Sequence, residues 1–197
     1  MNAYLTRRAG RDDIDELLAL FRRAEVSCYC RYFQFGGDKN AWLERCFVTP
    51  ERNAEELRAE VEMAPSDSPA GVVCRESERG PVLGWMKLTR ASRVPKLYEQ
   101  RPYRKLPNLG AEREGVFTVG CFLIDPAARR RGLCSELLSA GIRIARECGG
   151  TELEAFPRRG DDLRDEQLLA GPPSVFARHG FSAVHDDGPY PVLRLTL

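Results

Sequence analysis

Residues 115–150 read GVFTVGCFLIDPAARRRGLCSELLSAGIRIARECGG and carry the clearest pattern in the chain. Apolar side chains alternate on both faces of the first ten residues, as is typical of a strand covered on both sides of a sheet. The alternation predicts Phe117, Val119, Cys121 and Leu123 on one face and Val116, Phe122 and Ile124 on the other. Asp125-Pro126 ends the strand, because proline has no N–H for a sheet ladder. After a turn, an amphipathic helical period covers residues 134–148, and Gly149-Gly150 is typical of a helix end.

The turn between this strand and this helix is basic and contains a glycine. Arg129, Arg130 and Arg131 lie directly before Gly132. The first turn of a helix has unpaired N–H groups and a partial positive charge, and glycine lets a ligand approach the backbone. Neighbouring arginines favour a phosphorylated ligand. The pattern is equally typical of a solvated turn between a buried strand and a buried helix, so these residues alone leave both interpretations open.

Residues 129–134 resemble the R/Q-x-x-G-x-G/A motif of the GCN5-related N-acetyltransferases, the GNAT superfamily. Cys134 stands where that motif has glycine or alanine, and it is small enough to fit. Phe122-Leu123-Ile124-Asp125-Pro126 before the motif is also similar to the family pattern, and Phe176-Ala177-Arg178-His179-Gly180-Phe181 resembles its closing Y-x-x-x-G-F element. One subgroup is especially similar, since it shares Cys28-Tyr29-Cys30, the pair Cys121-Phe122, and Phe176 at the usual tyrosine.

The resemblance implies one domain over residues 1–197, of the α/β (α+β) class. It implies a central mixed, mostly antiparallel sheet of about seven strands, with helices on both faces and a splayed central parallel pair. It also implies acetyl-CoA as cofactor, with the pyrophosphate held by the motif loop and the pantetheine arm paired to a bulged strand. The residues so implied are Phe122, Leu123, Ile124, Arg129, Arg130, Arg131, Gly132, Leu133, Cys134 and Ser135.

Hydrophobic periodicity, together with glycine, proline and capping residues, predicts the other helices and strands. We expect strands at 3–8, 71–75, 81–90, 151–156, 181–185 and 191–197. We expect helices at 12–24, 38–47, 49–63 and 174–179, with caps or Pro50 near their starts. Residues 158–167 are predicted to form a charged loop. The basic, proline-containing segment 87–105 is predicted to be irregular, and it either covers a cleft or is a solvated insertion.

Composition narrows the function classes. The chain has 197 residues and a net charge of +1, which gives no general electrostatic case for nucleic acid or a membrane surface. No stretch approaches the roughly 18 to 20 apolar residues of a membrane span, and the N-terminus lacks a signal-peptide core. We therefore expect a cytoplasmic protein. The seven cysteines are expected to be free thiols. No metal is expected, because Cys28 and Cys30 have no second cysteine pair or histidine nearby.

Aromatic residues are the candidates for acceptor binding. Residues 27–35 form the most aromatic run in the chain, and in the family the corresponding segment borders the acceptor pocket. The candidates are Tyr29, Tyr32, Phe33, Trp85 and Phe156. They could line a pocket for an apolar or cationic acceptor, or they could pack helices onto the sheet.

The catalytic groups are the least determined part of the sequence. Family members often use the tyrosine of the closing element as the general acid, but Phe176 has no hydroxyl. Possible substitutes are Cys121, Ser174, Tyr29 and Tyr32. Glu154 on strand 151–156 is the candidate base, or else a surface carboxylate. Cys121 could also carry the acyl group, or be a small buried cysteine.

The preferred interpretation is an acetyl-CoA-dependent N-acetyltransferase that moves an acetyl group directly to a primary amine of a small molecule or protein. The alternative is a non-catalytic acyl-CoA-binding or regulatory module on the same scaffold, favoured by the missing hydroxyl at Phe176. A nucleic-acid binder using the segment 87–105 is a third, weaker interpretation. The resemblance also allows a homodimer.

Overall fold

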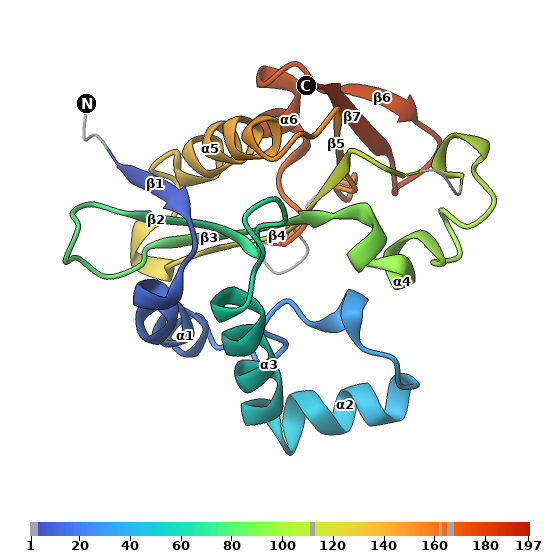
Figure 1. The fold of residues 1–197 in the computed structure, drawn as a ribbon. Coiled ribbons are helices and arrows are strands. Elements are labelled where there is room, and N and C mark those ends of the chain that lie inside the picture. Colours follow the sequence, from blue (N-terminus) through green and yellow to red (C-terminus); the bar gives the residue numbers. More distant parts are fainter. Residues whose placement is uncertain (1–3, 111–112, 162, 165–167) are drawn as a thin grey trace.

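The computed structural model describes residues 4–110, 113–161, 163–164 and 168–197 (Figure 1). Residue 3 of the first predicted strand and residues 162 and 165–167 of the predicted charged loop lie outside the described residues.

One sheet of seven strands forms the centre of the molecule, in the order β1-β2-β3-β4-β5-β7-β6. The strands are β1 (Leu5–Arg8), β2 (Gly71–Arg75), β3 (Gly84–Arg90), β4 (Val116–Ile124), β5 (Glu152–Ala155), β6 (Ser182–His185) and β7 (Val192–Thr196). All neighbouring pairs are antiparallel except β4 and β5, which are parallel. The predicted fold class is therefore confirmed.

Six α-helices connect the strands in the described part of the chain. They are α1 (Ile14–Arg23), α2 (Lys39–Phe47), α3 (Pro50–Glu62), α4 (Pro95–Tyr98), α5 (Leu133–Glu147) and α6 (Pro173–Arg178). Local chemistry sets several of their starts. The Asp38 side chain accepts a hydrogen bond from the Ala41 N–H at the start of α2, and Pro50 occupies the first position of α3, where no N–H is needed.

Two layers of helices cover the sheet (Figure 1). On one face α5 and α6 bury a cluster that includes Leu137, Phe176 and Phe122. On the other face α1 and α3 bury a second cluster, around Phe21 and Trp85. Each helix contributes an apolar stripe at helical spacing, so burial of that stripe explains its place against the sheet.

The segment between β3 and β4 is packed rather than solvated. It forms two short 3-10 turns and α4, and its apolar residues build a third cluster with β7 and the end of β5. That cluster contains Val94, Leu97, Tyr103, Leu109, Phe156 and Val192. Lys87 and Arg90 belong to β3, so the predicted irregular segment begins only after residue 90. The basic residues from Arg93 to Lys105 lie on an insertion that is anchored by its own small core.

A bulge divides β4 into two halves. Met86 of β3 faces Phe122 and Leu88 faces Val119, so two residues of β4, Gly120 and Cys121, lie opposite one residue of β3. The bulge changes the face on which later side chains lie. Phe117 and Val119 join the α5 cluster, whereas Cys121 and Leu123 contact the α1 and α3 cluster. The single alternation expected over 115–124 is thus wrong beyond Val119.

The parallel strands β4 and β5 part where the bulge begins. Their pairing ends at Val119 and Ala155, and β4 continues to Ile124 paired only with β3, so its edge toward β5 is freed. The Phe122 N–H is bonded to the carbonyl of Leu169 (2.6 Å), not to β5. The freed half of β4 and the start of α5 are therefore available to form one site.

Candidate active site

The mouth of α5 is open. Gly132 caps the helix in a left-handed conformation (φ 84°), and no side chain bonds the first N–H groups from the cap. A Cβ added at Gly132 would meet nothing within 4 Å. The preceding turn is held by Asp125, whose carboxylate accepts from the Ala127 N–H (3.0 Å) and from Arg23 Nε (2.7 Å). Backbone donors and a partial positive charge thus face free space.

A cavity of about 410 Å³ extends from this mouth along the freed half of β4. Among the residues that the sequence predicts for cofactor binding, it brings together Phe122, Leu123, Ile124, Arg129, Arg130, Gly132, Leu133, Cys134 and Ser135. The cavity therefore joins an apolar strand edge to a cationic helix mouth, which suits a ligand with a long arm and an anionic end.

Arg131 lies apart from this cavity. Its guanidinium pairs with the carboxylate of Glu76 after β2 and lies over the ring of Tyr4, 5.7 Å from the centroid. Arg130, the residue before it, has a left-handed backbone (φ 60°), so the two neighbouring side chains leave the turn in different directions.

Arg178 of α6 also lines the cavity, and sequence reasoning did not select it. It lies inside the closing element, where only the missing tyrosine hydroxyl drew attention. The following residue, His179, bonds Ser135 Oγ through Nε2 (2.8 Å) and so ties α6 to the start of α5. Burial and then the Arg178 charge lower the pKa of His179 below its ordinary 6.5.

The segment 168–172 forms the outer wall of the cavity. Besides the bond from the Phe122 N–H to the Leu169 carbonyl, Gly171 packs flat on two aromatic rings. A Cβ at Gly171 would lie 2.7 Å from the Phe122 ring and 2.9 Å from the Phe176 ring. One backbone donor on the freed edge of β4 thus already has a partner from this chain.

Phe176 is fully buried and offers no proton. Its ring packs edge-on against Phe122 (6.0 Å between centroids) and Phe181 (5.2 Å). Ser174, a possible substitute for the acid, is exposed.

Glu154 lies fully buried in β5 and is heavily bonded. Arg194 donates to Oε1 from Nη2 (2.7 Å) and Nε (3.2 Å), while Arg113 and the Tyr98 hydroxyl (2.9 Å) donate to Oε2. Accepting a proton from an amine would disturb these bonds, and in the structure this carboxylate is paired with two guanidiniums.

On the α1 and α3 face the bulge lies beside a buried group of charges that sequence reasoning missed. Lys87 of β3 donates to Glu60 Oε2 of α3 (2.5 Å), and Arg31 pairs with the same oxygen. A Cβ at Gly120 would meet the Lys87 side chain at 3.0 Å, which places Lys87 directly beside the bulge. Arg31, Glu60 and Lys87 come from three separate segments, so no sequence motif indicates that they form a cluster.

Mutual neutralisation keeps these buried groups charged. Burial raises the pKa of Glu60, but the Lys87 and Arg31 charges outweigh it, so the value lies below the ordinary 4.5. Burial lowers the pKa of Lys87 below 10.5, and Glu60 opposes that change.

Three thiols complete this face of the bulge. Cys30 is buried, whereas Cys28 and Cys121 keep partial exposure. The interaction with the Cys30 thiol, together with the nearby Lys87 ammonium, lowers the pKa of Cys121 below 9.0 although burial opposes the shift. The interaction with Cys121 and burial raise the pKa of Cys30 well above 9.0, and burial raises that of Cys28 to about 12.

The aromatic candidates divide between packing and the surface. Tyr29 stacks on Phe21 of α1 (4.8 Å between centroids), and Trp85 is fully buried in the α1 and α3 cluster. Phe156 is buried against Tyr98 and Tyr103. Tyr32 is exposed and Phe33 is half-buried. Of the five, Tyr32 and Phe33 thus keep surface open to an acceptor.

The ammonium of Lys96 occupies the ring cluster around Tyr32. It lies 4.6 Å from the centroid of Tyr32 and 5.3 Å from that of Phe35. It also donates to the carbonyls of Phe35 (3.0 Å) and Gly37 (3.3 Å), so α4 is tied to the aromatic run by a cation.

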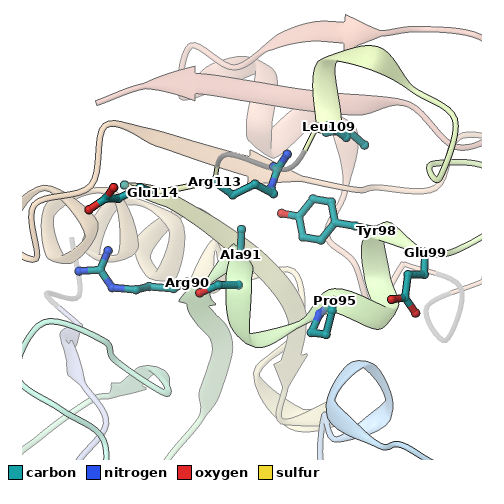
Figure 2. A pocket seen from close by; sticks show the side chains of 11 residues that line it. Arg90, Ala91, Pro95, Tyr98, Glu99, Leu109, Arg113 and Glu114 are labelled. Carbon is teal, nitrogen blue, oxygen red and sulfur yellow. The ribbon is translucent and has the colours of Figure 1, made fainter.

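A larger hollow, of about 1120 Å³, lies at the other end of β4, near Gly115. Figure 2 shows Arg113 beside Tyr98 on one side of it and Arg90 with Glu114 on the other. The Arg113 guanidinium stacks over the Tyr98 ring at 4.1 Å. Because β4 and β5 are still paired there, this hollow does not open onto the split between the strands.

In the part of the chain that the structure describes, no cluster of three or more His, Cys, Asp or Glu side chains is suited to a metal ion. None of the described helices combines the length and the apolar character needed to cross a membrane.

Comparison with known proteins gives one consistent result. The family model for the acetyltransferase (GNAT) family matches residues 38–164. The PaiA N-acetyltransferase of Thermoplasma acidophilum, solved with coenzyme A, has a TM-score of 0.59 at 12% identity, covering 99% of both chains. The yncA protein of Salmonella typhimurium, solved with acetyl-CoA, has a TM-score of 0.56 at 16% identity, covering 99% of this chain and 94% of its own.

The GNAT domain of S. lividans PAT is similar to the same degree, with a TM-score of 0.57 at 17% identity, covering 98% of this chain and 89% of its own. A search of curated protein sequences found no match. At such identities the structural likeness shows the fold and leaves the substrate open.

Proposed function

This chain belongs to the acetyltransferase (GNAT) family, and from that premise we propose that it is an acetyl-CoA-dependent N-acetyltransferase acting by direct transfer on a primary amine. The observation that carries the proposal is the open mouth of α5 at Gly132, continuous with the freed half of β4. The acetyl-CoA and coenzyme A bound to the Salmonella and Thermoplasma proteins support the choice of cofactor.

The residues present fit this cofactor. The N–H groups at the start of α5, with Arg130 and Arg178, would hold the pyrophosphate, and the edge of β4 from Phe122 to Ile124 would lie along the pantetheine arm. Binding at the Phe122 N–H requires the Leu169 carbonyl to give up its bond. Acetyl-CoA supplies the acetyl group as a thioester, whose carbonyl carbon accepts an amine.

The acceptor amine is proposed to arrive from the α1 and α3 face, past Tyr32 and Phe33. On that face Cys121 lies in the bulge, beyond the last β4–β5 pair. We assign it as the proton donor to the leaving thiolate. A thiol whose pKa is lowered is a stronger acid than an ordinary alkyl thiol, so it can protonate a thiolate of ordinary basicity.

A matched pair of glycine variants tests the cofactor site. Gly132→Glu puts a carboxylate into the mouth of α5, whereas Gly149→Glu adds the same charge and backbone strain (φ 73°) at the far end of that helix. Acetyl-CoA and CoA should raise the melting temperature of the wild type and of Gly149→Glu, but not of Gly132→Glu. No stabilisation of the wild type at millimolar ligand would refute the proposal.

The alternative is a non-catalytic acyl-CoA-binding module. It is favoured by Phe176, which has no hydroxyl, and by the bonded state of Glu154. Release of free CoA thiol with a panel of primary amines separates the two functions. Thermal stabilisation without thiol release would favour the module.

A further inference from the structure

A single carboxylate, that of Glu60 on α3, bonds two separate parts of the α1 and α3 face. Its Oε2 accepts from the Lys87 ammonium (2.5 Å) and from Arg31, and its Oε1 accepts from Gln34 Nε2 (2.9 Å). Lys87 belongs to β3, whereas Arg31 and Gln34 belong to the aromatic run after α1. Both carboxylate oxygens are therefore used by side chains that lie far apart in the sequence.

The Lys87 side chain lies against the bulge of β4. It is the residue of β3 that faces Gly120 and Cys121, and a Cβ at Gly120 would meet its Cβ and Cγ at 3.0 Å. The stem of Lys87 therefore passes over the bulge where glycine leaves room for it. Its ammonium end reaches Glu60, and the two side chains are only 4% and 8% exposed. This buried ion pair anchors the bulge to α3.

The turn that carries Tyr32 and Phe33 has little packing of its own. It is a single 3-10 turn, Tyr32–Gln34, without a buried residue. Tyr29 (φ 45°) and Cys30 (φ 54°), just before it, have left-handed backbones although neither is glycine. Such strain persists only where surrounding contacts impose it, so contacts from other segments must hold this part of the chain.

Polar bonds supply such contacts at both ends of the turn. Arg31 Nη1 donates to Gln34 Oε1 (2.8 Å), and both side chains bond Glu60. Arg31 Nε also pairs with Glu56 (3.2 Å), which lies one helical turn earlier on α3. The aromatic turn is thus tied to the same face of α3 that holds Lys87 and the bulge.

We propose that Glu60 is a positioning residue for the acceptor amine, because its carboxylate fixes the aromatic turn Tyr32–Gln34 relative to the bulge of β4. The inference rests on the proposed function, in which the acceptor passes Tyr32 and Phe33 to reach the bulge. Glu60 needs no contact with the acceptor for this role. The side chains bonded to Glu60 do not line the candidate cofactor cavity, so the role concerns the acceptor and not CoA.

Glu60→Gln leaves one acceptor oxygen for three donors. Lys87, Arg31 and Gln34 all donate N–H groups to the carboxylate, whereas an amide has one acceptor oxygen and an NH2 group that only donates. If the oxygen faces the two cations, the NH2 group faces Gln34 Nε2 and the bond to the turn is lost. If the amide is rotated, the cations lose their partner. Either orientation separates the turn from the bulge while keeping the volume of the side chain.

The kinetic test compares Glu60→Gln and Gln34→Ala with Glu55→Gln, an exposed control on the same helix. Gln34→Ala frees the turn but keeps the buried Lys87 pair, so this variant should fold even if Glu60→Gln does not. With a primary amine that releases CoA thiol from the wild type, the acceptor KM should rise about fivefold in both variants, as expected for one lost hydrogen bond. The Kd for CoA should stay at the wild-type value in all three. An unchanged acceptor KM in Gln34→Ala, or an equal loss of CoA affinity, would overturn the positioning role.

Tryptophan fluorescence tests the hold on the turn without acetyl transfer. Trp42 is half-buried, with its ring 5.3 Å from those of Tyr32 and Phe35, whereas Trp85 is fully buried. Acrylamide, a neutral quencher, therefore reports mainly on Trp42. Its quenching constant should rise in Glu60→Gln and Gln34→Ala as the turn moves away, and stay unchanged in Glu55→Gln.

The outcomes separate this proposal from the proposed function. Unchanged quenching in both variants would show that Glu60 does not fix the turn, and would overturn the proposal even in an active enzyme. If the wild type releases no CoA thiol with any amine, acetyl transfer fails and the acceptor role fails with it, while raised quenching would still show that Glu60 holds the turn. Raised quenching together with a raised acceptor KM is the expected result.

Discussion

The two faces of β4 near its bulge are built in opposite ways. Toward α5, the candidate cofactor cavity consists of backbone donors, an open glycine and exposed arginines. Toward α1 and α3, the bulge is packed with the buried charges of Lys87 and Glu60 and with the thiols of Cys30 and Cys121, which contact the same apolar cluster. The first face, called the open face below, presents backbone donors to a ligand. The second, called the closed face, is filled at the bulge itself by side chains that satisfy one another, and it leaves the surface of Tyr32 and Phe33 for an acceptor.

This difference explains why the sequence predicts the residues of the open face but not those of the closed face. A site made of backbone needs a short contiguous segment, such as residues 129–135, and so leaves a motif. A site made of side chains draws single residues from α3, β3, β4 and the turn after α1. The comparison predicts that substitutions on the closed face change stability, while those on the open face change ligand affinity.

The largest expected effect is on the closed face. Glu60→Leu leaves the buried ammonium of Lys87 without its carboxylate partner and leaves Arg31 paired with Glu56 (3.2 Å), and it should lower the free energy of unfolding by about 3–5 kcal/mol. Urea unfolding measures the change. Glu56→Leu is the matched control, one turn earlier on α3. Its carboxylate is 43% exposed and pairs with Arg45 (2.7 Å) and Arg31 (3.2 Å). Because Arg31 keeps Glu60 in this variant, the substitution should cost less than about 1 kcal/mol. Equal losses would contradict the division between the faces.

Lowering the pH should remove the stabilisation that the Glu60 carboxylate provides. The folded-state pKa of Glu60 lies below its ordinary 4.5, so its stabilisation is fully present above about pH 4.5 and is lost as pH falls through the folded value. The difference in unfolding free energy between wild type and Glu60→Gln should therefore be constant near neutral pH and shrink below about pH 4.5. Urea titrations from pH 7 to acid check this. A gap that widens in acid would contradict the assigned direction.

An intermediate effect is expected on the open face. Arg178→Ala removes a cation from the cavity and should weaken CoA binding about tenfold, with little change in the urea midpoint, because Arg178 is exposed. Isothermal titration with CoA measures the affinity. Arg143→Ala is the control, since Arg143 lies on the same layer of helices but pairs with Glu147 on the solvent side of α5 (3.1 Å). Parallel losses of affinity in both variants would indicate a general charge effect.

The sequence predicted the elements well where local chemistry fixes their ends. Pro50 begins α3, Asp125-Pro126 ends β4, and Gly132 precedes α5, within a residue or so of the expected positions. These signals are local, because a proline or a left-handed glycine limits the backbone whatever surrounds it. The family resemblance, carried by residues 129–134, supplied the seven-stranded topology that local signals do not contain.

What sequence reasoning missed depends on long-range packing. The bulge at Gly120-Cys121 inverts the faces of β4, and alternation alone gives no sign of it. Glu154 looked available in the pattern of its strand, but Arg113 and Arg194 approach it from other segments. The Leu169 carbonyl on the Phe122 N–H comes from a segment with no regular structure.

The smallest expected effect separates two neighbouring arginines of one motif. Arg130 lines the cavity, whereas Arg131 points to Glu76 and Tyr4 across the turn. Because Arg131 does not line the cavity, Arg131→Ala should change CoA affinity by less than about twofold. The exposed pair with Glu76 contributes little to stability, so the urea midpoint should stay in place. Arg130→Ala should weaken CoA binding several-fold more, since its charge faces the ligand.

Isothermal titration of both variants with CoA decides the matter, because the two substitutions remove the same charge from adjacent positions. Both variants lose one positive charge near the mouth of α5. Any difference in CoA affinity between them therefore reports the direction in which each arginine side chain points. If Arg131→Ala weakens binding as much as Arg130→Ala, then total charge governs affinity and not the placement of single side chains. The open face would then resemble a diffuse cationic surface, and the contrast with the closed face would be one of charge rather than of construction.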